Sequence, residues 1–353
     1  MDGQRIVFTA ANQAELQPFP VEESLPGDEV LVQTLYTLIS PGTEGAWYSA
    51  VQRDVAGDRF TYPIYPGYCH VGRVMACGPQ TVGVAQGDVV VSGAAHASHV
   101  RLGTARGGAF VHADLRQPLG RVPKGVPLPL APFAKMAEIA ITAVRSAEFS
   151  LGDKVLVTGL GMVGNLAAQL FQLAGADVMA TDLVPFRLER ARACGIRRAI
   201  NPREVDLEAA VRDWSGGHGA HVTVESVGLS ELILQAIGLT RRLGQVILLG
   251  TPRQKAMLNP TPAFWRAHMN GITIRGALRC LFYPLDDDPY HGHSVASDLE
   301  QVLGWIESGQ LQVAPLHTHT YQPDQCQAAY QALQQDRDHY LGVVLDWQGF
   351  AED

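Results

Sequence analysis

The chain has 353 residues, 46% of them hydrophobic and 18% charged, and a formal net charge of −8 at pH 7. This length suggests two domains with an ample apolar core. The negative charge argues against nucleic acid or an anionic membrane surface as a partner. Five scattered cysteines lack a CxxC spacing, so we expect reduced thiols and a cytoplasmic protein.

The first 125 or so residues consist of short apolar runs broken by glycine and proline. Strands are expected at 29–37, 71–77, 88–92 and 99–102, separated by turn signals such as Pro26-Gly27 and Pro41-Gly42. The pattern predicts a compact all-β unit. A proline-punctuated crossover follows, and a helix is expected at about 134–147.

The stretch from Lys154 to Asp182 reads KVLVTGLGMVGNLAAQLFQLAGADVMATD. It predicts a strand, a glycine-rich turn, a helix, a second strand and an acid. Gly159 permits the tight turn, Gly161 lets backbone approach a pyrophosphate, and Gly164 lets the helix pack on the strand. The uncharged part is long enough to span a bilayer, but its glycines and polar residues favour a buried strand, turn and helix.

Asp182 lies where a carboxylate can bond the hydroxyls of an adenosine ribose and repel a 2′-phosphate, so NAD is expected rather than NADP. Arg187 either shelters the adenine or is a solvated helix charge. Cofactor contacts are expected from Gly159, Gly161, Met162, Val163, Gly164, Asp182, Arg187, Val227, Gly250 and Thr251. A glycine-rich turn that binds no ligand is the open alternative.

After residue 187, helical and strand patterns alternate, with strands expected at 199–200, 221–225, 245–250 and 272–276. This alternation predicts a parallel sheet covered by helices. Two βαβαβ halves would suit a dinucleotide rather than a mononucleotide. Helices at 299–308 and 326–334 and a last strand at 341–347 are expected to return to the N-terminal unit.

This order of units resembles the medium-chain dehydrogenase/reductase (alcohol dehydrogenase-like) superfamily. The local sequences that carry the resemblance are LGDKVLV from Leu151, VTVESVG from Val222, LGQVILLG from Leu243, and Pro66-Gly67 with the following Val-Gly-Arg-Val. The resemblance implies an α/β chain with a GroES-like, β-rich catalytic domain at 1–134. It implies a Rossmann NAD-binding domain at 135–278 and a return to the catalytic domain at 279–353.

The metal-ligand positions depart from the zinc-dependent members of this superfamily. Pro41 stands where they carry a cysteine, Tyr68 stands where they carry a histidine, and a third ligand would fall near Ala134. A zinc site needs three or four convergent ligands, so neither a catalytic nor a structural zinc is expected. A metal alternative rests on His291, His293, His317 and His319.

The segment from Ser40 to Glu44, with Pro66-Gly67-Tyr68, also resembles a zinc-lacking branch near bacteriochlorophyllide a dehydrogenase. That likeness is local, and the substrate is not carried over.

Without zinc, side chains at the vacated positions must stabilise charge on a substrate oxygen and move a proton. The resemblance implies that Thr43 is a proton-relay hydroxyl, unless it is a simple turn hydroxyl. It implies that Glu44 is an acid behind the metal position, or instead pairs with an arginine. Tyr68 either donates a hydrogen bond to a carbonyl oxygen or packs behind the cofactor. His70 has a usable pKa, or it is a satisfied structural imidazole.

Lys135 and Glu138 complete the candidate catalytic residues. They lie one helical turn apart and interrupt an otherwise uncharged run at 126–144. A buried pair here would polarise a substrate or orient the nicotinamide, whereas a surface pair on an amphipathic helix is the alternative.

The favoured hypothesis is a zinc-independent, NAD-dependent oxidoreductase that moves a hydride between nicotinamide and a secondary alcohol or ketone. A small polyol or sugar-like molecule is the expected substrate. The alternatives are a zinc-free quinone or enoyl reductase that uses NAD(P)H, and a non-catalytic dinucleotide-binding protein. A homodimer that pairs the edge strand at 272–276 is expected by analogy.

Overall fold

The computed structural model describes residues 1–104, 119–278 and 292–350. The chain forms two compact units. The first comprises Met1–Arg53, Asp58–Glu138 and Tyr283–Asp353, and the second comprises Asp54–Gly57 and Ile139–Phe282. These units describe packing, and the functional domain bounds at 1–134, 135–278 and 279–353 stay a prediction.

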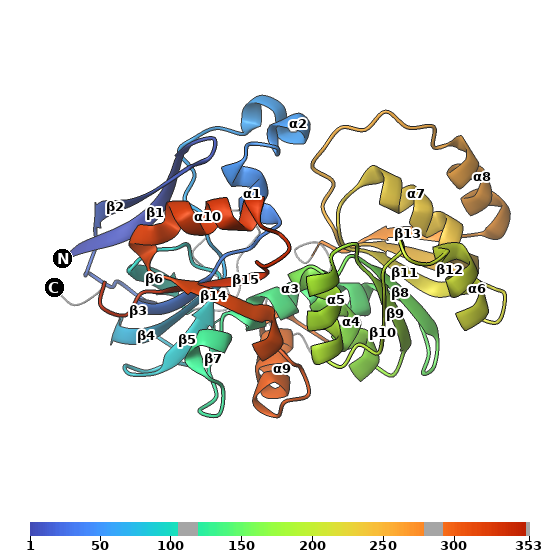
Figure 1. Ribbon diagram of the computed structural model, residues 1–353. Coiled ribbons are helices and arrows are strands. Elements are labelled where there is room, and N and C mark those ends of the chain that lie inside the picture. Colours follow the sequence, from blue (N-terminus) through green and yellow to red (C-terminus); the bar gives the residue numbers. More distant parts are fainter. Residues whose placement is uncertain (105–118, 279–291, 351–353) are drawn as a thin grey trace. The chain divides into compact units, whose positions relative to one another are not determined.

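Within the described residues, the first unit is built on a seven-stranded sheet in the order β14-β15-β3-β4-β5-β7, with β6 pairing to β3. Its strands are β3 (Glu29–Leu38), β4 (His70–Cys77), β5 (Val89–Ser92), β6 (His99–Gly103), β7 (Gly120–Arg121), β14 (His317–Tyr321) and β15 (Gly342–Asp346). Because β15 pairs antiparallel with β3, the red C-terminal strands continue the blue N-terminal sheet in Figure 1. Both ends of the sequence therefore build one sheet.

A hairpin and helices complete this unit: β1 (Asp2–Ala10), β2 (Gln13–Pro20), α1 (Thr43–Tyr48), α9 (Val295–Glu307) and α10 (Cys326–Gln335). Phe8 of β1 meets Tyr330 of α10 edge-on, with ring centroids 4.8 Å apart. Tyr48 of α1 stacks on the same Tyr330 ring at 5.4 Å. This aromatic contact fixes α1 against the C-terminal helix.

The second unit contains, within the described residues, a six-stranded parallel sheet in the order β10-β9-β8-β11-β12-β13. Its strands are β8 (Lys154–Thr158), β9 (Asp177–Thr181), β10 (Arg198–Ile200), β11 (Ala220–Glu225), β12 (Thr240–Leu248) and β13 (Thr273–Gly276). The chain runs outward from β8 in one direction and then in the other. Such open sheets bind ligands beyond the carboxyl ends of the strands at this switch point.

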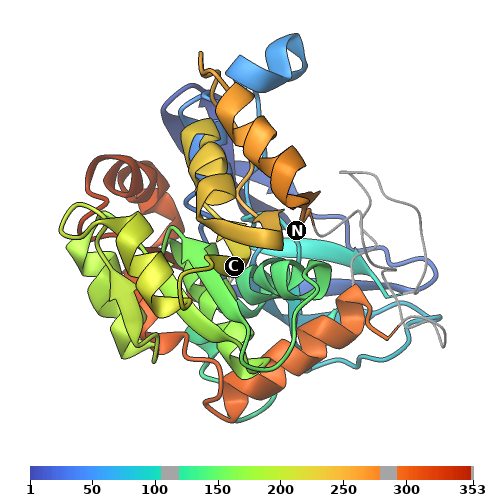
Figure 2. The ribbon, with the colours of Figure 1, turned by 90° about the vertical axis from the view of Figure 1, so that its right-hand side faces the viewer.

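Helices cover both faces of the second sheet: α4 (Met162–Leu173), α5 (Pro185–Ala193), α6 (Leu207–Trp214), α7 (Ser230–Leu239) and α8 (Thr261–Asn270). Val155 and Val157 of β8 pack with α4 and α5, whereas Leu156 packs with α6, because successive strand residues point to opposite faces. Figure 2 shows α7 and α8 side by side. The predicted fold class, a Rossmann unit plus a β-rich unit, is confirmed.

Two helices have residues in both units, namely α2 (Arg53–Ala56) and α3 (Phe133–Ser146). No helix in the described ranges has the length and apolar character that a membrane crossing requires. The uncharged stretch at 155–176 folds instead as most of β8, then the turn and α4.

The expectation of an all-β unit in the first 125 residues is wrong, because α1 lies inside it. A six-residue helix has no stability of its own in water, so its sequence carries little signal. Contacts from α10 stabilise it: Gln334 Nε2 donates to the carbonyl oxygen of Gly45 at 2.9 Å. The β1–β2 hairpin and α8 were not predicted either.

Candidate functional site

The glycine-rich turn between β8 and α4 has the shape of an anion cradle. Gly159 has φ +89°, and a Cβ on Gly164 would lie 2.0 Å from the Gly159 carbonyl oxygen. Gly161 is the N-cap of α4, and no side chain caps this helix end. A Cβ on Gly161 would meet nothing within 4 Å. Free N–H groups beside open space suit a pyrophosphate.

Asp182 follows β9 and braces this turn. Its Oδ2 accepts a hydrogen bond from the Leu160 N–H at 2.7 Å, and its Oδ1 accepts one from Val184 at 2.9 Å. Arg187 of α5 places Nη1 3.6 Å from Asp182 Oδ2. Among the described residues, the buried Arg187 Nε has no hydrogen-bond partner. The structure therefore brings Asp182 and Arg187 together beside the glycine-rich turn. Within the described residues, the Arg187 Nε–H remains without a hydrogen-bond acceptor.

The ends of β11 and β12 carry the other predicted cofactor residues. The Ser226 hydroxyl donates to the carbonyl oxygens of Thr158 and Gly159 at 2.8 and 2.9 Å. Val227 and Thr251 are exposed, and a Cβ on Gly250 would lie 2.4 Å from the Gly228 nitrogen. These turns therefore pack directly on each other and on the glycine-rich turn. Of the two residues at the start of α4, Met162 is buried and Val163 half-buried, so Met162 offers a ligand its backbone alone.

In the first unit, Tyr68 lies among hydroxyl groups. The half-buried phenol donates a hydrogen bond to Ser40 Oγ. Burial raises the pKa of Tyr68, with Cys69 and Glu44 adding to the rise, and hydrogen bonds with Ser40 and Thr43 oppose it. Tyr68 is therefore protonated at neutral pH, which makes it a hydrogen-bond donor and not a base.

Glu44 is fully buried and is held by three donors. Its Oε2 accepts from Tyr330 Oη at 2.5 Å and from His96 Nε2 at 2.9 Å, and its Oε1 accepts from the Ser40 N–H at 2.9 Å. The alternative of an arginine partner is wrong. His96 precedes β6 rather than lying in a strand, and this lets its ring reach Glu44. Glu44 thereby fixes the turn that carries Ser40.

His70 has both ring nitrogens occupied. Nε2 lies 3.0 Å from Thr34 Oγ1, and Nδ1 lies 2.8 Å from Ser92 Oγ. Burial, with a smaller contribution from His96, lowers the pKa of His70 to about 3. The ring is neutral and satisfied, which favours the structural alternative over a proton-transfer role. Tyr68 and His70 thus have separate sets of partners.

Lys135 and Glu138 form a buried ion pair on α3. Lys135 Nζ lies 2.5 Å from Glu138 Oε2, and the two side chains are 2% and 1% exposed. The surface-pair alternative is wrong for these residues. Removing two charges from water costs several kcal/mol, so burial of this pair is a weak source of stability. Its expected role in orienting or polarising a bound molecule stays a prediction.

The residues at the family's zinc positions do not fit a zinc ion. Pro41 has no donor atom, and the Tyr68 hydroxyl is protonated and bonded to Ser40. Over the described ranges, no cluster of three histidine, cysteine or acidic side chains could hold a metal. His317 bonds Thr320 Oγ1, His319 stacks on Tyr340, and His291 lies outside the described residues.

Sequence reasoning missed Ser40, His96, Tyr330, Glu225 and Ser226. For Glu225 a signal was present, because an acid ends the otherwise apolar segment VTVE. For Tyr330 there was none, since it meets Glu44 across 286 positions of sequence.

Comparison with known proteins supports the resemblance. Residues 162–287 match the sequence profile of the family described as zinc-binding dehydrogenase. The L-threonine 3-dehydrogenase of Alteromonas mediterranea is 25% identical over a 311-residue alignment, which covers 81% of this chain and 83% of that protein.

Two solved structures share the fold. A dehydrogenase of zinc-binding type from Sinorhizobium meliloti 1021, bound to NADP, has a TM-score of 0.76 and 15% identity over 98% of this chain and 99% of that one. Galactitol-1-phosphate dehydrogenase from Escherichia coli has a TM-score of 0.78 and 17% identity over 97% and 99%. The sequence matches are with proteins named dehydrogenases, and the solved structures show the shared fold.

Proposed function

We propose that this chain, an NAD(P)-dependent enzyme of the medium-chain dehydrogenase type, works without zinc and prefers NAD. It moves a hydride between the nicotinamide and the carbinol or carbonyl carbon of a secondary alcohol or ketone. A polyol or sugar-like molecule is the proposed substrate class. The dinucleotide supplies the hydride chemistry, and the residues of the chain bind it, orient it and move the proton.

The observation that carries the cofactor part is the uncapped start of α4 beside Asp182. Open space at Gly161 leaves room for a pyrophosphate, and the Asp182 carboxylate would repel a 2′-phosphate. Arg187 partly offsets that charge, so the preference for NAD is expected to be finite. The structural neighbour from S. meliloti is described as bound to NADP, and we propose that Asp182 makes this chain favour NAD.

The zinc-independent part rests on the hydroxyl groups around Tyr68. Because this phenol stays protonated, we propose that it turns its hydrogen from Ser40 to a substrate oxygen as negative charge builds there. Thr43, which bonds Tyr68, is proposed as the next group for the proton. We propose that the buried Lys135–Glu138 pair orients the reacting molecule.

The substrate class draws support from the names of relatives. One relative is named for oxidation of L-threonine at position 3, and a structural neighbour is named for the polyol derivative galactitol 1-phosphate. A hydroxyl-bearing small molecule is the chemistry that these two names share.

The test measures whether turnover depends on zinc and which of two substrate panels the protein turns over. The purified protein should contain far less than one zinc per chain, and a chelator should leave turnover unchanged. Polyols with NAD should be oxidised, whereas enones with NADPH should not be reduced. Chelator-sensitive turnover would overturn the zinc-independent proposal, and enone reduction would favour the quinone or enoyl reductase alternative.

We also propose a homodimer in the cytoplasm. The edge strand β13 pairs on one side with β12, and Ile274 is 40% exposed on it. An unpaired strand edge is a template for a second copy. Within the described residues, Cys69, Cys77, Cys194 and Cys326 form no disulfide, which suits a reducing compartment. Cys280 lies outside the described residues.

A further inference from the structure

Glu225 is a buried carboxylate at the carboxyl end of β11, in the middle of the second sheet. It pairs in register with Thr158 of β8 and with Leu248 of β12. Its side chain is inaccessible to solvent. Burial raises the pKa of Glu225, and backbone N–H groups of Gly228, Val227 and Leu229 oppose the rise. A buried carboxylate needs such donors, because leaving it unpaired costs several kcal/mol.

The carboxylate holds the turn that follows it. Oε1 accepts from the Val227 and Gly228 N–H groups, both at 2.9 Å, and Oε2 accepts from Gly228 at 3.0 Å. The Glu225 carbonyl oxygen accepts from Leu249 and Gly250 at 2.8 Å each. One residue therefore connects the turn after β11 with the segment after β12.

The turn formed by residues 226–228 packs tightly against Gly159 and Thr251. Gly228 has φ +83°, and a Cβ there would lie 2.3 Å from the Thr251 carbonyl oxygen. A Cβ on Gly159 would lie 2.5 Å from Val227 Cγ2. A shift of the 226–228 turn would therefore displace Gly159, Thr251 or both.

The two halves of a dinucleotide lie on either side of the switch point. We expect Asp182, which follows β9, to bind the adenosine half, so the turns after β11 and β12 would face the nicotinamide half. We propose that Glu225 is a positioning residue for the nicotinamide half, acting through the 226–228 turn. This inference rests on the proposed function, because it needs a dinucleotide to be bound.

The experiment titrates NADH and ADP-ribose, which lacks the nicotinamide, against the full-length protein and its Glu225→Gln variant. Glutamine keeps the shape but replaces one acceptor oxygen with an N–H₂ group facing the turn. NADH affinity should fall about tenfold, the size of one lost hydrogen bond to a charged group. ADP-ribose affinity should fall less than NADH affinity, because ADP-ribose lacks the nicotinamide and is affected only through the contact of Val227 with Gly159.

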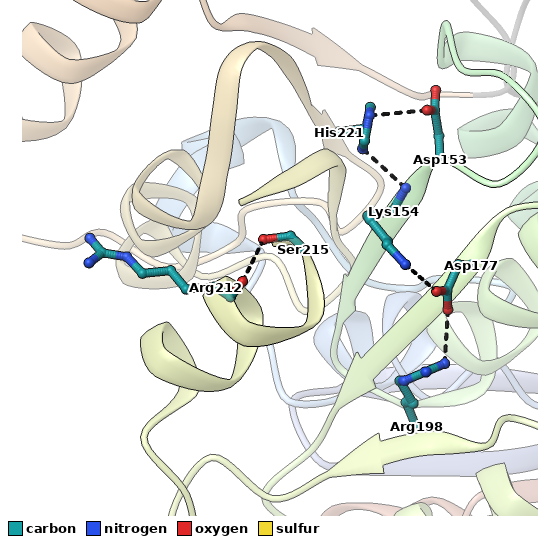
Figure 3. Close-up of polar contacts among 7 residues, drawn as sticks. All are labelled: Asp153, Lys154, Asp177, Arg198, Arg212, Ser215 and His221. Atoms are coloured by element: carbon teal, nitrogen blue, oxygen red, sulfur yellow. Dashed lines mark hydrogen bonds and ion pairs between the residues drawn. The ribbon is translucent and has the colours of Figure 1, made fainter. Parts of the chain in front are cut away.

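The matched control is His221→Gln, at the opposite end of the same strand. Figure 3 shows His221 with Asp153 and Lys154, within a charged group that includes Asp177 and Arg198. This group lies at the amino ends of the strands, away from the turns that Glu225 holds. The control should leave both affinities unchanged.

Equal weakening of NADH and ADP-ribose in Glu225→Gln would overturn the inference in favour of a general structural role. An unchanged NADH affinity would overturn it as well. If the unaltered protein binds neither molecule, the proposed function itself fails. If Glu225→Gln does not fold, Glu225→Asp keeps the charge with a shorter reach, and the same two titrations decide.

Discussion

At the scale of single residues, Tyr68 is the proposed hydrogen-bond donor to the substrate oxygen. Its hydroxyl bonds Ser40 and Thr43 and stays protonated because of burial. Glu44, itself held by His96 and Tyr330, fixes the backbone of Ser40. Buried polar groups that are all satisfied hold one geometry, so the orientation of Tyr68 is set by residues from both ends of the chain.

Tyr68→Phe should lower kcat about a hundredfold with little change in KM, since removing one donor to a developing oxyanion costs that much. Steady-state kinetics with the substrate identified from the polyol panel measures this. The control is Tyr65→Phe, an exposed tyrosine in the same segment. A kcat within twofold of the unaltered protein would remove Tyr68 from the mechanism.

Asp182→Gly should shift cofactor choice toward NADP. The ratio of kcat/KM for NADP over NAD should rise about tenfold or more, because like-charge repulsion costs several kcal/mol and 1.4 kcal/mol is a factor of ten. Affinity for both cofactors should also fall, since Leu160 and Val184 lose their acceptor. Glu189→Gln is the control, because Glu189 is an exposed acid on α5, the helix that follows Asp182. An unchanged ratio would count against our role for Asp182.

At the scale of elements, the start of α4 combines two glycines with different physical constraints. A Cβ on Gly161 would point into open space. A Cβ on Gly164 would instead lie 2.0 Å from the carbonyl oxygen of Gly159, in the turn after β8. One glycine thus leaves room for a ligand, and the other lets a helix approach a strand.

Gly161→Ala should therefore fold with a loss of less than about 1 kcal/mol in unfolding free energy, yet bind NADH about tenfold or more weakly. Gly164→Ala should lose roughly 1–3 kcal/mol of stability or more through overpacking. Chemical unfolding and NADH titration separate the two effects. A Gly161→Ala variant that binds NADH with unchanged affinity would contradict the proposal that the glycine-rich turn binds the pyrophosphate.

At the scale of the whole molecule, the edge strand β13 and the helix α8 each carry exposed apolar side chains. Phe264 and Trp265 on α8 are 56% and 65% exposed, and Ile274 lies on the edge strand itself. Exposed apolar patches next to an unpaired edge mark association surfaces.

Ile274→Lys should convert a dimer to a monomer, because a lysine on a strand edge opposes pairing. Light scattering after size exclusion should give a mass falling from about twice to once 38.1 kDa. Val205→Lys replaces an exposed residue that follows β10, at the other end of the sheet, and should leave the mass unchanged. A monomer before any substitution would refute the dimer proposal.

The unit proposed to bind the dinucleotide could be predicted from the sequence alone, because its signals are local. Strand, glycine turn, helix and acid follow one another within 154–182, and short-range periodicity and backbone sterics specify each of them. The turn geometry at Gly159 and the closeness of Asp182 to that turn agree with this prediction. The spacing of Lys135 and Glu138 likewise predicted a pair.

The folded structure alone shows that this pair is buried, that His70 is neutral with both ring nitrogens hydrogen-bonded, and which groups hold Glu44. It also shows that residues 43–48 form the helix α1 and that Glu225 accepts hydrogen bonds from the turn after β11. Each of these depends on which distant side chains remove water and supply hydrogen bonds. Periodicity along the chain carries no information about such partners.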